Sequence, residues 1–213
     1  MCNIAYVDLQ PADLVSEFSL RNGEALSQIH ELFADIVPQI FAEMEPRHPD
    51  GRIHGGIFSG NVRDAFLVEL QARAMSVAGL TAKEHPFRSV RFRDELGWPC
   101  RVHMHPKSLR TGRYISTTPR PEPLFGAPLD GMELELAVLW RPSPRTKSLK
   151  SITLAAVWDL ADRNRTVIFA SSQLPPIGMH AYWLPEVTEQ YFAPADDFDD
   201  YFNEDESFGD EPA

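Results

Sequence analysis

The sequence predicts an α+β fold in which N-terminal helices pack on one face of a predominantly antiparallel sheet of roughly six strands, followed by a disordered acidic tail. Up to about residue 80, apolar residues recur every three to four positions, as in amphipathic helices. From Phe87 onward they recur at every second position, as in half-buried strands. Helices followed by strands, without a repeated βαβ alternation, are typical of the α+β class.

Two main helices are expected in the first part of the chain. Residues 24–44 carry an apolar stripe at helical spacing, and Pro38 is expected to kink or divide that helix. A short helix around Leu14–Phe18 is expected before it or as its first part. The second helix is expected to start between Ser59 and Asn61 and to end at Gly79. Its apolar face would comprise Val62, Phe66, Leu70, Ala74 and Val77.

Six segments with period-two patterning predict strands: 89–93, 99–105, 112–117, 133–140, 151–160 and 165–172. The loop between the third and fourth segments contains four prolines, which makes it unsuitable for a central strand. Short connections link the last three segments, so these are expected to form an antiparallel meander. The predicted organisation is one domain over 1–191, with a helical part (12–80), a β-rich part (87–173) and a closing segment (174–191), followed by the tail 192–213.

Composition excludes several classes of protein. No apolar run approaches the ~20 residues that a membrane helix needs, and the N-terminus lacks the basic and apolar regions of a signal peptide. We therefore expect a cytoplasmic protein without a membrane partner. Cys2 and Cys100 are the only cysteines and form no C-x-x-C pair, so neither a metal site nor a disulfide framework is predicted.

Charge is unevenly distributed along the chain. Segment 192–213 contains nine acidic and no basic residues; without it, the formal net charge of −11 becomes −2 for residues 1–191. Residues 88–120 instead carry eight basic and two acidic residues, a net charge of +6. The predicted binding residues in this block are Arg88, Arg91, Arg93, Arg101, His103, His105, Lys107, Arg110 and Arg113.

The basic block predicts a surface that contacts nucleic acid or another polyanion. Arg91 and Arg93 are two positions apart on one strand and therefore share a face, as do His103 and His105 with Arg101. Such rows are suited to following phosphates, while the nearby rings of Phe92, Trp98 and Tyr114 are expected to stack on bases. The leading hypothesis is a non-catalytic binding protein without a cofactor.

The tail adds a second expectation. Its acids are interleaved with the aromatic residues Phe198, Tyr201, Phe202 and Phe208. A segment of this composition is suited to lying in a basic groove, where it would compete with phosphates for the 88–120 surface. Alternatively, the tail itself binds a protein partner and the domain serves as its carrier, which would make the chain a protein-interaction adaptor.

An enzymatic alternative rests on a resemblance. Gly112–Thr118 (GRYISTT) resembles the serine-threonine-serine strand of the Arg-Ser-Glu class of ADP-ribosyltransferases, and Glu133-Leu134-Glu135 is similar to its Glu-x-Glu motif. The resemblance implies NAD as the cofactor, held in part by Ser116, with its phosphates gripped by an arginine such as Arg91. It further implies that Glu135 stabilises the oxocarbenium and that Glu133 orients the nucleophile.

Overall fold

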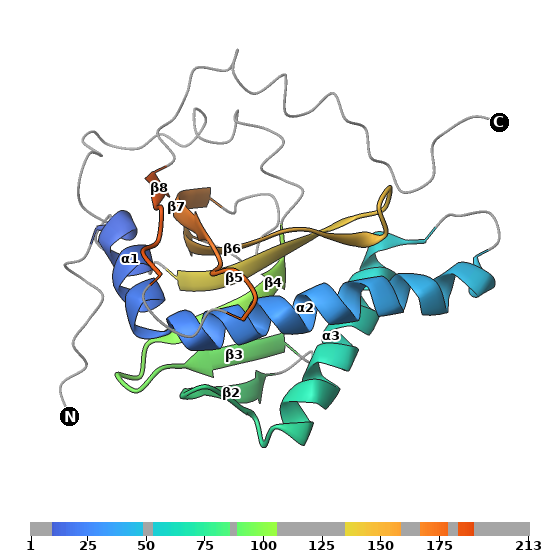
Figure 1. Cartoon of the computed structure of the whole chain (residues 1–213), viewed down its shortest axis with the longest axis horizontal. Coiled ribbons are helices and arrows are strands. Elements are labelled where there is room, and N and C mark those ends of the chain that lie inside the picture. Colours follow the sequence, from blue (N-terminus) through green and yellow to red (C-terminus); the bar gives the residue numbers. More distant parts are fainter. Residues whose placement is uncertain are drawn as a thin grey trace, which may run out of the picture.

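The computed structural model describes residues 10–48, 53–85, 89–105, 135–158, 167–178 and 183–189. In this part of the chain, helices precede a mostly antiparallel sheet, which confirms the predicted α+β class (Figure 1). The helices are α1 (Pro11–Arg21), α2 (Gly23–Met44) and α3 (Gly55–Ala72), with a short 3-10 helix, η2 (Glu45–Arg47). The strands are β1 (Ser76–Val77), β2 (Leu80–His85), β3 (Ser89–Arg93), β4 (Pro99–Met104), β5 (Glu135–Ser143), β6 (Ser148–Trp158), β7 (Val167–Gln173) and β8 (Thr188–Glu189). No helix of the described residues is long and apolar enough to cross a membrane.

Asn22 separates α1 from α2, so the stretch around Leu14 is a helix of its own. The Asn22 backbone and side-chain amides both donate to the Phe18 carbonyl, each at 3.0 Å, and Asn22 is also the N-cap of α2. α2 then continues through Pro38 without a break. A proline inside a helix costs about 3 kcal/mol. Burial of an apolar side chain contributes about 1.5–3 kcal/mol, so the buried neighbours Val37, Ile40 and Phe41 together outweigh that cost.

The predicted bounds of the second long helix are wrong at both ends. α3 begins at Gly55, where the His54 side chain accepts a hydrogen bond from the Gly56 amide at 3.2 Å. Helix propensity disfavours two glycines in a first turn, and the imidazole supplies the cap that compensates for them. The helix ends at Ala72, because Ala74 and Met75 adopt left-handed φ angles of 53° and 59°.

Within the described residues the sheet contains eight strands in the order β1 to β8, where roughly six were predicted. The short strands β1 and β8, together with β2, were not predicted. The meander β5–β6–β7 is antiparallel, as expected, whereas β4 and β5 pair in parallel, with Val102 opposite Val138. Parallel neighbours need a long connection, and residues 106–134 between these strands lie outside the described part. The predicted strand at 112–117 and the tail 192–213 also lie outside it.

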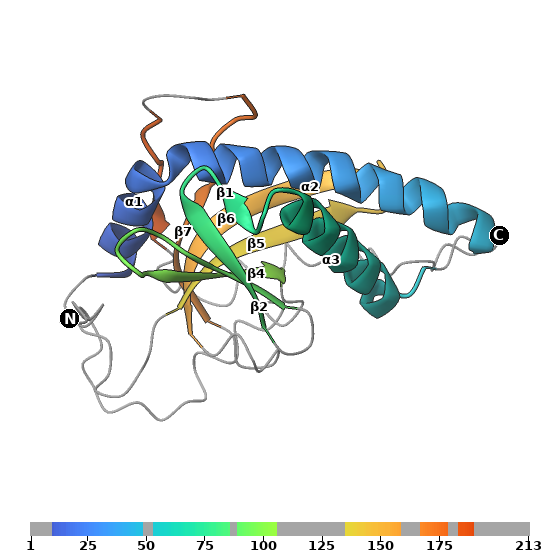
Figure 2. The ribbon, with the colours of Figure 1, turned by 90° about the horizontal axis from the view of Figure 1, so that it is seen from below.

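One main core joins the helices to the sheet. α1 and α2 run along one side of the sheet, and α3 packs beside α2 (Figures 1 and 2). Phe33 of α2 lies between Phe66 of α3 and Trp140 of β5, with ring centroids 4.7 and 5.4 Å apart, and Phe66 also meets Phe92 of β3. Alternate strand residues therefore point toward the helices, and the residues between them form the opposite surface. We call this surface the far face of the sheet.

The far face has two different halves. On β5–β7 it carries a second, smaller cluster of buried apolar residues: Ala137, Leu139, Ala155, Val157 and Ile168. On β2–β4, where Ala82, Val90, Phe92 and Cys100 point into the main core, the residues between them are mainly polar and charged. The candidate site lies in this second half.

Candidate functional site

Three basic residues form a straight row across the far face. Lys83 of β2 lies opposite Arg91 of β3, and Arg91 lies opposite Arg101 of β4. Since directly opposed residues of neighbouring strands share a face, the three side chains emerge side by side. We call Lys83, Arg91 and Arg101 the basic row. Lys83 is exposed, and the two arginines are partly exposed.

The basic row has few acidic partners within the described part of the chain. Arg101 forms an ion pair with Glu135 at the start of β5, with 3.1 Å between Nε and Oε2. For Lys83, Arg91 and Arg93, which follows on β3, no ion pair is found among the described residues. Like charges directly opposite each other on a sheet are destabilising. Among the described residues, the basic row therefore carries three positive charges against the one carboxylate of Glu135.

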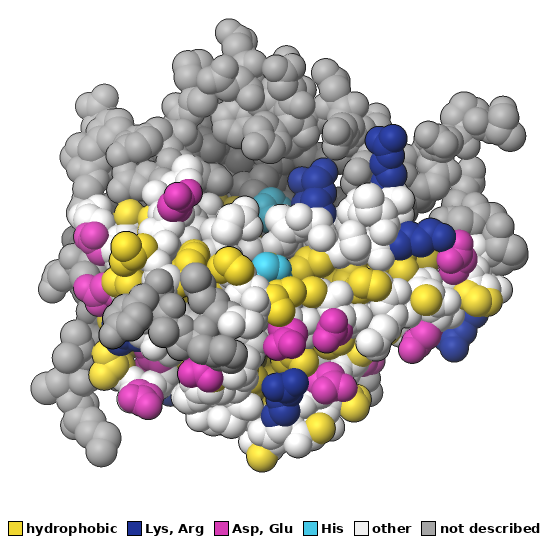
Figure 3. Space-filling model, viewed as in Figure 1, with side chains coloured by type: hydrophobic (Ala, Val, Ile, Leu, Met, Phe, Trp, Pro, Cys, Tyr) yellow, Lys and Arg dark blue, Asp and Glu magenta, His cyan; other side chains and the backbone are white. Residues whose placement is uncertain are grey.

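The two layers of the domain differ in charge. α2 contains four acidic residues and no lysine or arginine in its 22 residues. Figure 3, which shows the helix side of the molecule, has acidic side chains spread over this layer. The basic row lies on the opposite side of the sheet. Among the described residues, the basic side chains of the row and the acidic side chains of α2 thus lie on opposite sides of the sheet, and basic side chains attract anions.

The structure separates the residues of the predicted basic block. Arg91, Arg93, Arg101 and His103 belong to β3 and β4 and lie on the far face, as their spacing predicted. His103 Nδ1 lies 2.6 Å from the Met104 carbonyl, and the His105 amide donates to the Trp140 carbonyl beyond the end of β4. Arg88, Lys107, Arg110 and Arg113 lie outside the described residues. Lys83 was missed because 80–85 was not predicted to be a strand.

Two rings expected to stack on bases are buried instead. Phe92 is fully buried in the main core, on the helix side of β3. Trp98 is 7% exposed, and the Arg21 guanidinium lies 4.0 Å from its ring centroid. The prediction for these two rings is therefore wrong, because strand alternation and the β3–β4 turn direct them inward. Tyr114, the third ring, lies outside the described residues.

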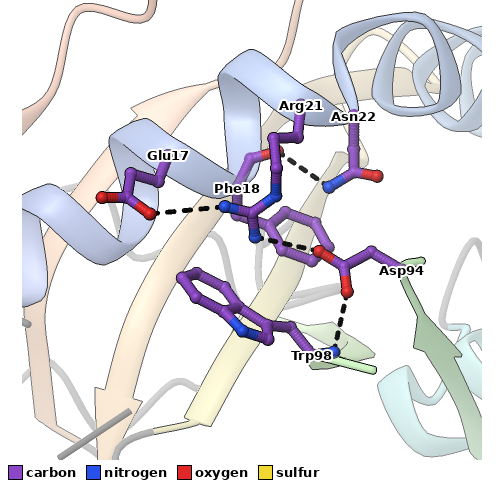
Figure 4. Close-up of polar contacts among 6 residues, drawn as sticks. All are labelled: Glu17, Phe18, Arg21, Asn22, Asp94 and Trp98. Atoms are coloured by element: carbon purple, nitrogen blue, oxygen red, sulfur yellow. Dashed lines mark hydrogen bonds and ion pairs between the residues drawn. The ribbon is translucent and has the colours of Figure 1, made fainter. Parts of the chain in front are cut away.

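A partly buried ion pair holds the β3–β4 hairpin, and with it the basic row, against α1 (Figure 4). Asp94, whose side chain is 3% exposed, accepts a hydrogen bond from Arg21 Nη2 at 2.9 Å and one from the Trp98 amide at 2.7 Å. Glu17 approaches the other Arg21 nitrogen at 3.3 Å. Gly97 provides the positive φ of 82° that the turn requires. These contacts fix the hairpin whose two strands contribute Arg91 and Arg101.

The residues of the enzymatic alternative are only partly described. Ser116 and Glu133 lie outside the described residues, and Glu135 is in the ion pair with Arg101. Cys100 is buried beneath the basic row, and burial, which desolvates the thiolate, raises the pKa of its thiol to about 12. Such a thiol stays protonated at neutral pH and is a poor nucleophile. Within the described residues, no group of three or more His, Cys, Asp or Glu side chains is arranged to hold a metal ion.

No protein-family model, curated protein or solved structure matched this chain when it was compared with each.

Proposed function

We propose that this protein binds a polyanion on the far face of its sheet, and that nucleic acid is the ligand. The observation that carries the proposal is the in-register alignment of Lys83, Arg91 and Arg101, for which Glu135 is the one acidic partner found among the described residues. Strands in a sheet are about 4.8 Å apart, so the row spans about 10 Å. This length lets a nucleic-acid strand place neighbouring phosphates along the row.

The position of the aromatic side chains supports recognition of the backbone rather than of the bases. Phe92 and Trp98 are buried, so neither offers a stacking platform. Phosphate contacts position a ligand without reading its sequence. We therefore expect little preference for base sequence and a strong dependence of affinity on salt, because each neutralised phosphate releases condensed counterions.

The test is fluorescence anisotropy of labelled single-stranded and duplex oligonucleotides of mixed sequence, from about 50 to about 200 mM salt. The test variant carries Lys83→Gln, Arg91→Gln and Arg93→Gln. We expect the slope of log affinity against log salt to fall by about three, about one for each lost phosphate contact. Arg101 is kept, since its removal would leave Glu135 without the ion pair.

A matched control removes three positive charges elsewhere. Arg47 follows α2, Arg73 caps α3 and Arg145 lies in the β5–β6 turn, and all three are exposed. Their joint replacement by glutamine changes the net charge by the same amount. Equal losses of affinity in both variants would show that affinity depends on net charge and not on the position of the charges, which would contradict a site on the far face. Absence of binding by the wild type at low salt would refute the proposal.

A further inference from the structure

We infer that the acidic tail of this chain, residues 192–213, occupies the basic row when no external polyanion is bound. This inference rests on the proposed function, since both assign the same surface to an anionic ligand. The tail is the partner because its charge, its length and its point of departure fit the row.

The charges are complementary. The described residues around the row supply Lys83, Arg91, Arg93 and Arg101 against the carboxylate of Glu135. The tail supplies nine carboxylates and no basic residue. The helix layer is a poor alternative dock, because α2 is itself acidic. The far face is thus a described surface on which an acidic segment gains favourable electrostatic energy.

The tail is also long enough. β8, which ends at Glu189, is four strand positions from β4 and six from β2. At about 4.8 Å between strands, these separations are about 19 and 29 Å. An extended chain advances at most about 3.3–3.6 Å per residue. Residues 196–200, which carry four of the nine acids, therefore come within reach of Arg101, and the later acids within reach of Lys83.

Because the tail is attached to the same chain, weak contacts between the tail and the basic row are sufficient for the tail to occupy it. A tethered segment acts at an effective concentration in the millimolar range. If the tail alone binds the row with a dissociation constant near 0.1 mM, tethering lowers the apparent affinity for an external ligand about tenfold. The tail would then exclude weakly bound polyanions and yield to long, highly charged ones.

The binding experiment uses the full chain with Asp196, Asp197, Asp199 and Asp200 all replaced by asparagine. The matched control neutralises four exposed acids of the helix layer, Glu31, Asp35, Glu43 and Glu69, and changes the net charge equally. We expect about tenfold tighter oligonucleotide binding for the tail variant than for this control. Equal gains in the two variants would show a general charge effect and overturn the inference.

A second measurement needs no oligonucleotide, so it separates failure of the inference from failure of the proposed function. A spin label is attached at Ser207→Cys in a Cys2→Ser background, where the buried Cys100 does not react. We expect the label to broaden the amide NMR signals of Arg91 and Arg101 at low salt, to release them at high salt, and to spare Glu31. Absence of this broadening would overturn the inference even if oligonucleotides bind. Broadening only between mixed spin-labelled and isotope-labelled chains would assign the contact to a second copy and overturn it as well.

Discussion

Replacement of Arg21 by methionine tests whether the partly buried ion pair between α1 and the β3–β4 hairpin stabilises the domain. Methionine retains much of the apolar side chain but removes the positive charge. The carboxylate of Asp94, 3% exposed, then keeps only the hydrogen bond from the Trp98 amide. The stacking of the guanidinium on the Trp98 ring is lost at the same time.

The expected cost follows from three contributions. Loss of one partner of a buried pair costs about 3–5 kcal/mol when both groups are buried. Arg21 is 31% exposed, so water screens part of the interaction and the lower end of that range applies. A partly exposed cation–π contact adds about 0.5–1 kcal/mol. We expect the free energy of unfolding to fall by about 3 kcal/mol and Tm by about 6–12 °C for a chain of this size.

The assay is urea denaturation followed by circular dichroism, with thermal melting as a second measurement. A double-mutant cycle adds Asp94→Asn, which keeps an acceptor for the Trp98 amide. We expect the double variant to be more stable than the sum of the two single effects predicts, by about 1–2 kcal/mol, because the charges interact directly. The control is Arg63→Met, whose partner Asp64 is 4.0 Å away and half-exposed, with an expected effect below about 0.5 kcal/mol. An effect of Arg21→Met no larger than that control, or strict additivity in the cycle, would refute the reasoning.

Two further predictions concern the core and a helix. The Cys100 thiol has its pKa raised from 9.0 to about 12 by burial, so the unfolded chain loses this proton first as pH rises. The contribution of the protonated thiol to the free energy of unfolding is complete below pH 9 and is lost as pH rises toward 12. Between pH 8 and about 10.5, the free energy of unfolding should therefore fall by about 2 kcal/mol more for the wild type than for Cys100→Ala. Equal losses, measured by urea denaturation at both pH values, would contradict burial of the thiol. Gly60 lies inside α3 with no atom within 4 Å of an added Cβ, so Gly60→Ala should stabilise the protein by about 0.5–1 kcal/mol. A lower Tm for this variant would show that the helix does not tolerate a side chain there.

Local patterns predicted those features that depend on neighbouring residues in the chain. The strand 89–93 has the predicted bounds, because alternating Val90 and Phe92 with Arg91 and Arg93 encodes one buried and one polar face. The α+β class followed from the change of period. The start of α3 could not be predicted from the local sequence, because its cap is a histidine side chain and two glycines follow that residue. Propensity disfavours a helix there unless the cap is known.

The sequence by itself determined the helix-then-strand order, the uneven distribution of charge, and the sharing of one face by Arg91 and Arg93. Only the tertiary structure decided that Lys83, Arg91 and Arg101 lie in one row, since cross-strand register is set by contacts between distant segments. It also decided that Phe92 and Trp98 are buried and that β4 pairs with β5 in parallel. The physical reason is the same in each case. Folding minimises the exposed apolar surface of the whole domain and not of any one segment. This requirement selects the face of each strand that is buried and the strand that lies beside it.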